Sequence, residues 1–208
     1  MNLAKLLQLA SPALPVGGYS YSGGLEAAIE AGAVTDAASA QRWIEDVLAH
    51  CVARLDAPML LRMMREPKPW NARFLASRET AELRAETVQM GYSLNRLLPD
   101  LGVPALALEE PSFPAAFAHA AKAWGIAPHG ALLAYLWSWA ENQVMAALKA
   151  VPLGQTDGQR ILLALGARLE AVADQAEAMT EDEIGSFAPA LAILSSQHET
   201  QYSRLFRS

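Results

Sequence analysis

The residues that come nearest to a catalytic motif are His198 and Glu199, in the run His-Glu-Thr-Gln-Tyr. Zinc metalloproteases carry two histidines one helical turn apart, with a glutamate beside the first that acts as general base. Tyr202 stands where the second histidine would be, so the pair of metal ligands is broken. We interpret His198 as a polar group at the end of a helix, and keep a helical metalloenzyme using His198 and Glu199 as an alternative of another functional class.

A glycine-rich stretch, residues 17–24 (GGYSYSGG), invites comparison with phosphate-binding loops. A P-loop requires a lysine and then a serine or threonine after its last glycine, to bind phosphate and Mg²⁺. Gly24 and Leu25 occupy those two positions. Ser20 also lacks the second glycine and the preceding strand of a nucleophile elbow. The stretch therefore predicts neither nucleotide binding nor hydrolase chemistry.

Other candidate groups are a cysteine and a polar run that follows an apolar segment. Cys51 is the single cysteine, which excludes an intrachain disulfide and fits a reducing compartment. Its neighbour His50 points about 100° away on a helix, so the two do not chelate together and we expect a core thiol. We interpret Glu141, Asn142 and Gln143 as hydrogen-bonding groups between helices, with ligand binding as the alternative.

The composition favours one folded, all-α domain in the cytoplasm. Of the 208 residues 52% are hydrophobic and 18% charged, and alanine and leucine dominate over β-branched types. The net charge of −6, without a cluster of basic residues, argues against nucleic acid as a partner. The longest uncharged apolar stretch, residues 125–140, is shorter than the roughly 20 residues of a membrane span. The N-terminus is a poor secretory signal.

Helical periodicity, with cap and breaker residues, predicts about nine or ten helices joined by short turns and no strand. We expect the nearly apolar helix 128–150 at the centre of a helical bundle, and the irregular connection 99–114 as a hinge. The other expected helices cover residues 3–10, 22–31, 112–124, 158–179 and 184–198, and three more begin at the caps Asp36, Asp56 and Thr80.

Several blocks of this sequence resemble the UreF family of urease accessory proteins. They are residues 11–18 (SPALPVGG), 19–26 (YSYSGGLE), 79–84 (ETAELR), 149–155 (KAVPLGQ) and the C-terminal 198–208 (HETQYSRLFRS). The blocks keep their order across nearly the whole chain, so the resemblance is global. One departure is Gly23, where related sequences commonly carry a larger residue such as glutamine.

The resemblance implies an all-helical, dimeric, non-enzymatic protein without a cofactor or a metal site of its own. Residues 1–208 would form one UreF-like domain, with an N-terminal arm over 1–21 and a partner-binding tail over 198–208. By the same resemblance the chain would bridge a UreD-type (UreH-type) accessory protein and the GTPase UreG, so that nickel reaches apo-urease. An alternative within the family is direct action on GTP hydrolysis by UreG, through Arg204, Arg207 or Lys149.

The glycine-rich stretch 17–24 carries two tyrosines, and the tail 198–208 carries aromatic and arginine side chains, which are types typical of interface hot spots. Because too little chain follows the tail to form a core, we expect it to be mobile or loosely docked in the free protein and to order on binding. Tyr19 and Glu26 would contact a partner, closed over by the tail; alternatively, Tyr19 and Tyr21 only fix the N-terminal segment to the core. The candidate partner-binding residues are Tyr19, Ser20, Tyr21, Glu26, Lys149, Gln155, His198, Glu199, Tyr202, Arg204, Phe206 and Arg207.

Overall fold

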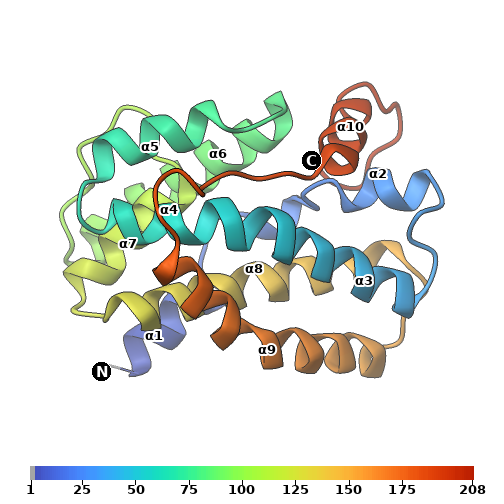
Figure 1. The fold of residues 1–208 in the computed structure, drawn as a ribbon, viewed down its shortest axis with the longest axis horizontal. Coiled ribbons are helices and arrows are strands. Elements are labelled where there is room, and N and C mark those ends of the chain that lie inside the picture. The colour runs from blue at the N-terminus through green and yellow to red at the C-terminus, as the bar shows by residue number, and fades with distance from the viewer. Residues whose placement is uncertain (1–2) are drawn as a thin grey trace.

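The computed structural model describes residues 3–208, and this part of the chain contains ten α-helices and no strand (Figure 1). The all-α, single-domain prediction is confirmed. The arm expected over residues 1–21 begins with two residues that lie outside the described part. The helices are α1 (Leu3–Ala10), α2 (Leu25–Glu30), α3 (Ala37–Val47), α4 (Ala57–Met63), α5 (Pro67–Ala76), α6 (Ala81–Leu97), α7 (Phe113–Ala123), α8 (Pro128–Ala150), α9 (Gln155–Ala178) and α10 (Pro189–His198).

Helix α8 forms the centre of the bundle, as its apolar sequence predicts. It contacts α1, α2, α3, α4, α7 and α9, and the longest of these contacts runs along α9 (Figure 1). Side chains on several of its faces are buried, including Leu132, Leu136 and Val144. A helix that is apolar on most of its circumference is stable only when other helices enclose it. No helix among residues 3–208 has the length and apolar character that a membrane crossing requires.

Two of the expected N-caps begin helices in the predicted way. The Asp36 carboxylate accepts a hydrogen bond from the backbone N–H of Ser39 at 2.8 Å, in a capping box at the start of α3. The Thr80 hydroxyl accepts from the backbone N–H of Leu83 at 3.2 Å at the start of α6. Each bond satisfies a backbone donor that the first helical turn leaves free.

Asp56 does not act as the cap that the sequence suggests. A π-helical segment, Leu48–Asp56, joins α3 to α4 without a break, and Asp56 itself has helical φ and ψ angles of −63° and −50°. Its side chain makes no capping bond and instead contacts other helices. The sequence analysis also did not predict α5, which begins at Pro67 and has a second proline, Pro69, in its first turn. Prolines in a first helical turn cost little, since those N–H groups have no partner within the helix.

Helices far apart in the sequence meet at one end of the molecule. Helix α10 lies beside α2 and also contacts α6 (Figure 1). The residues after α10 therefore emerge next to the glycine-rich segment that precedes α2. This convergence positions most of the candidate residues.

Candidate docking site and an adjoining cavity

A buried histidine lies at the convergence of α2, α6 and α10. The side chain of His198 is 0% exposed, and its Nδ1 and Nε2 lie 2.6 Å from Glu82 Oε2 and 3.1 Å from Glu26 Oε2. A carboxylate only accepts hydrogen bonds and a neutral imidazole has one N–H, so both bonds form together when the ring carries both protons. Arg204 adds a further ion pair, with its Nη1 2.6 Å from Glu82 Oε1. We call Glu26, Glu82, His198 and Arg204 the tail clasp.

The tail clasp also binds the backbone of the C-terminal tail. Glu26 accepts hydrogen bonds from the N–H groups of Leu205 and Phe206 at 2.6 and 2.8 Å. Charge-assisted bonds of this kind are about twice as strong as neutral ones. Glu26 therefore holds the tail against α2, and His198 Nε2 contacts the same oxygen, Oε2, that accepts from Phe206.

The last residues of the tail pair with the glycine-rich segment. The Arg207 N–H donates to the Ser20 carbonyl at 2.8 Å, and the Ser22 N–H donates to the Ser208 carbonyl at 3.0 Å. Phe206 and Ser208 are buried. The expectation of a mobile or loosely docked tail is wrong for this structure. Few apolar groups follow α10, but the backbone of the tail is held by hydrogen bonds to Glu26, Ser20 and Ser22.

Lys149, at the end of α8, connects the two segments. Its Nζ donates to the Tyr19 carbonyl at 3.2 Å and lies 5.6 Å from the centre of the Tyr19 ring and 5.5 Å from that of Phe206. An ammonium group at this distance from an aromatic face is attracted by the ring. The structure thus brings the glycine-rich segment, the end of α8 and the tail together, as the candidate set supposes.

The candidate residues divide by exposure. Tyr19 is 69% exposed and Tyr202 is fully exposed, whereas Tyr21 is buried and fixes the N-terminal segment to the core. Glu199 is exposed but is not free, because it accepts hydrogen bonds from two backbone N–H groups at the start of α6. Gln155 is exposed at the first residue of α9, and none of the described contacts joins it to the tail.

His198 is not arranged as a metal ligand. Both of its ring nitrogens face carboxylates of the tail clasp. Among residues 3–208, no three or more histidine, cysteine, aspartate or glutamate side chains are grouped so that they could hold a metal ion. The Glu199 carboxylate points to the start of α6, away from the role of a general base beside a metal.

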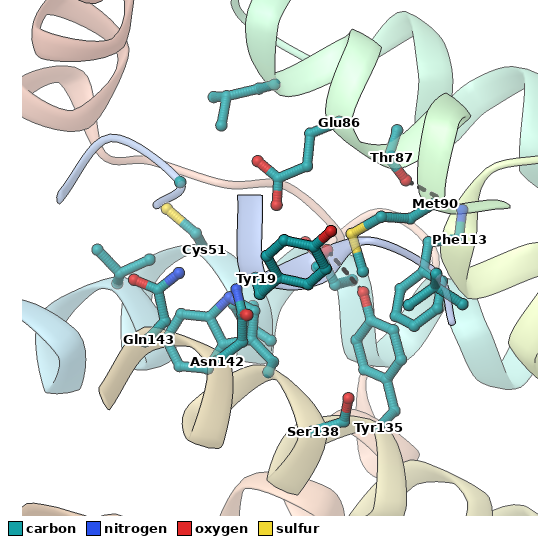
Figure 2. A pocket seen from close by; sticks show the side chains of 18 of the residues that line it. Tyr19, Cys51, Glu86, Thr87, Met90, Phe113, Tyr135, Ser138, Asn142 and Gln143 are labelled. Carbon is teal, nitrogen blue, oxygen red and sulfur yellow. Dashed lines mark hydrogen bonds between the residues drawn. The ribbon is translucent and has the colours of Figure 1, made fainter. Parts of the chain in front are cut away.

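A cavity of about 420 Å³ adjoins this region (Figure 2). Its lining comes from the glycine-rich segment, the π-helical segment, α6 and α8, and includes Cys51. Burial, and next the charge of Asp56, raise the pKa of the Cys51 thiol to about 12. The thiol therefore stays protonated, and the prediction of a core thiol is confirmed.

Two charged side chains of the lining, Asp56 and Arg78, form an ion pair with each other. Arg78 Nη2 lies 3.2 Å from Asp56 Oδ2, and the Tyr135 hydroxyl donates to Asp56 Oδ1 at 3.2 Å. Burial, and then the charge of Asp56, raise the pKa of Tyr135 well above its ordinary value, so it remains a donor. The carboxylate that failed to cap α4 thus neutralises the guanidinium group of Arg78.

Glu86 is a second carboxylate in the lining, and it has no such partner. It forms no salt bridge within residues 3–208, and its one hydrogen bond comes from the Ser208 hydroxyl at 2.7 Å. Desolvation is the main cause that raises the pKa of Glu86 to about 7. The sequence analysis missed this residue. Its position three residues after Leu83 and four before Met90, on the apolar stripe of α6, was the available signal.

The fold and the site together define the class of this protein. It is an all-helical domain in which a polar cluster binds the backbone of the C-terminal tail. The UreF family profile matches residues 34–166, which is more than half of the chain. The chain belongs to the UreF family.

Full-length relatives support this assignment. A urease accessory protein UreF from Azoarcus sp. is 56% identical, over all of this chain and 96% of the relative. Another, from Dechloromonas aromatica, is 53% identical over all of this chain and 98% of the relative. The resemblance noted in the sequence is confirmed, and with it the placement among accessory proteins rather than enzymes.

Proposed function

We propose that this chain serves urease maturation as an adaptor, joining a UreD-type (UreH-type) protein to a UreG-type GTPase so that nickel reaches apo-urease. We further propose that it works as a homodimer in the cytoplasm. The observation that carries the proposal is the sequence identity of 56% and 53% to two proteins named urease accessory protein UreF, along essentially the full length of each pair of chains. The geometry of the docked tail supports the same function.

The surface around the tail clasp has the composition of a protein interface. Tyr19, Tyr202 and Leu205 are 69%, 105% and 61% exposed. Arg204 and Arg207 belong to the same tail as Tyr202 and Leu205 and are also exposed. We call these five residues the tail surface. Exposed aromatic, leucine and arginine side chains on a fixed backbone supply binding energy with little ordering cost.

The buried candidates have a different role in this proposal. Glu26 and His198 lie beneath the tail, with side chains only 12% and 0% exposed, so they position the tail surface for a partner instead of contacting the partner. Phe206 and Ser20 act in the same way, through burial and a backbone hydrogen bond.

The test is co-expression of this chain with a UreD-type and a UreG-type protein, followed by size-exclusion chromatography with and without GTP and nickel. We expect a stable complex with the wild-type chain. The double variant Tyr202→Ala/Leu205→Ala should lose it, with unchanged far-UV circular dichroism. The control is Leu163→Ala, which removes a 78%-exposed leucine from α9. A wild-type chain that joins neither protein contradicts the adaptor function, and a double variant that still co-elutes contradicts the tail surface.

A second candidate function is direct modulation of GTP hydrolysis. Arg204 is paired with Glu82 and Lys149 with the Tyr19 carbonyl, whereas the Arg207 side chain makes no hydrogen bond or ion pair with the described residues. Arg207 is therefore the one of the three that is available to reach a nucleotide. An arginine finger does not tolerate lysine, so Arg207→Lys should reduce UreG turnover of GTP as much as Arg207→Ala does. Unchanged turnover in both variants contradicts this function.

A further inference from the structure

Two polar groups of the cavity lining lack, within residues 3–208, a partner of the kind they need: Gln143 lacks a hydrogen-bond donor and Glu86 lacks a cation. Gln143 is 3% exposed, and its Oε1 has no hydrogen-bond partner in the described part of the chain. Glu86 has no cationic partner within 4.0 Å among the same residues. Buried acceptors without donors are uncommon in folded proteins, because each costs about 1–3 kcal/mol. In Figure 2 the two side chains approach the cavity from different helices, Glu86 from α6 and Gln143 from α8.

The charges around the cavity leave one negative charge uncompensated. Asp56 and Arg78 neutralise each other through their ion pair. The lining also contains Glu79 and Lys149, both exposed, so that three carboxylates (Asp56, Glu79 and Glu86) stand against two cations (Arg78 and Lys149). Glu82, which also acts on Glu86, is paired with His198 and Arg204. The lining therefore carries one more carboxylate than cation, and Gln143 Oε1 lacks a donor while the Nε of Arg78 lacks an acceptor among the described residues.

The remaining walls are apolar and aromatic, and the size fits a small molecule. Met90, Phe113 and Trp139 line the cavity, and the exposed side chains of Tyr19 and Met145 are also part of its lining. Small-molecule sites measure roughly 300–1,000 Å³ and combine such walls with a few polar groups. A volume of about 420 Å³ lies within this range.

The donor set favours an organic cation over a metal ion. Glu86 and the Gln143 amide supply one carboxylate and one carbonyl oxygen, and the Cys51 thiol is protonated. A bare divalent ion would find too few ligands here to replace its water shell. An alkylammonium group brings its own N–H donors, and its hydrocarbon body matches the walls.

We propose that this cavity is a binding site for a small organic ammonium ion with an apolar body, whose charge pairs with Glu86 and whose remaining donors satisfy Gln143 Oε1. The site is independent of the partner proteins, so it can be measured on the isolated chain. A failure of the adaptor function would leave it unaffected.

The experiment compares 2-phenylethylamine with its neutral counterpart 2-phenylethanol by isothermal titration calorimetry at pH 7.5. We expect saturable one-to-one binding of the amine, and binding of the alcohol roughly 10-fold weaker or more, as for loss of a charged hydrogen bond. Glu86→Gln should remove the preference for the amine. Glu79→Gln, which alters an exposed carboxylate at the rim, should preserve it.

The pH dependence of amine binding provides a second test of the role of Glu86. Because the amine pairs with ionised Glu86, binding should release a proton and weaken as the pH falls through about 7. The calorimetric enthalpy should then depend on the ionisation enthalpy of the buffer, and this dependence should vanish in Glu86→Gln. Gln143→Leu should weaken binding of the amine without removing its pH dependence.

Three outcomes would overturn the proposal. Equal affinity for amine and alcohol would show an apolar cavity in which Glu86 has no part. Absence of binding by both would show a cavity that holds only water. Saturable binding of NiCl₂ alone, lost in Glu86→Gln while the amine does not bind, would show a metal site. Circular dichroism and thermal unfolding of each variant establish that it is folded.

Discussion

Two histidines of this protein each lie between two glutamates, but in very different surroundings. His129, on α8, has Nδ1 3.0 Å from Glu177 and Nε2 3.0 Å from Glu170, and its side chain is 39% exposed. His198 also lies between two glutamates, but its side chain is 0% exposed. Both partners of His129 belong to α9, whereas those of His198 come from α2 and α6, 172 and 116 residues away in the sequence.

The comparison shows that burial and topology, not the identity of the groups, determine what such a cluster does. Water screens the pairs of His129, so removing them costs little. In the tail clasp, removing one partner leaves a largely buried carboxylate without one of its few compensating groups, and water cannot fully replace it. The exposed cluster of His129 adds two ion pairs between α8 and α9, which already pack against each other along their length. The buried one fixes the end of the chain.

The largest expected difference is between His198→Ala and His129→Ala. Loss of His198 leaves Glu26 and Glu82 facing each other in a desolvated space, and we expect the free energy of unfolding to fall by about 3–5 kcal/mol. The same change at His129 should cost less than about 1 kcal/mol. Urea unfolding at pH 7 measures both. Equal losses in the two variants would contradict the distinction between buried and exposed clusters.

Glu26→Gln tests the contacts of the tail backbone. The amide keeps one acceptor of the carboxylate but loses its charge, so the bonds to Leu205, Phe206 and His198 weaken. We expect a loss of about 2 kcal/mol and faster trypsin cleavage at Arg204. The matched control Glu177→Gln, in the exposed cluster, should change neither quantity. Unchanged cleavage in Glu26→Gln would mean that other contacts hold the tail.

Arg204→Ala should have a smaller effect on stability. Its side chain is 38% exposed, so its pair with Glu82 is screened, and we expect a loss of less than about 1 kcal/mol. The effect should shrink further in 0.5 M NaCl, because salt screens exposed pairs. A loss comparable to that of His198→Ala would place Arg204 in the structural core of the tail clasp.

The smallest effect concerns the pH dependence of the exposed cluster. Hydrogen bonds that the protonated His129 ring donates to Glu170 and then to Glu177 raise the pKa of His129 above 6.5. The folded state therefore binds the proton more tightly than the unfolded state, and this contribution is present below pH 6.5 and lost as the pH rises through the folded-state pKa. His129→Gln should lower stability by a few tenths of a kcal/mol at pH 5.5 to 6 and leave it unchanged at pH 9. A deficit that grows with pH would reverse the assigned direction.

Local sequence signals predicted much of the fold. The bounds of α8 followed from its apolar pattern, Pro128 and the end at Ala150, and Asp36 and Thr80 capped as expected. These features depend on residues within a few positions of one another. The failures at Asp56 and α5 have the opposite cause. Asp56 is drawn away by Tyr135 and Arg78, and the prolines of α5 favour equally a loop or a first helical turn.

The candidate site was predicted in its parts but not in its arrangement. Tyr19, Lys149 and Phe206 were selected for their residue types, and the structure places them in one contact. The burial of His198 and Glu26 could not be predicted, because it arises from segments more than 100 residues apart. The place of Glu86 on the apolar stripe of α6 could be read from the sequence, but its lack of a cationic partner among the described residues is a property of the folded structure.

The π-helical segment determines in which direction the side chains at its end and in α4 point around the helix axis. Its i→i+5 bonds accommodate an additional residue, and one residue corresponds to a rotation of about 100° around a helix axis. Excising one residue at the exposed Ala49 would let the segment wind as an ordinary α-helix and swing Asp56 away from Tyr135 and Arg78. One inserted amino acid, invisible in the composition, thereby decides which carboxylate meets the guanidinium group and which is left without a counter-ion.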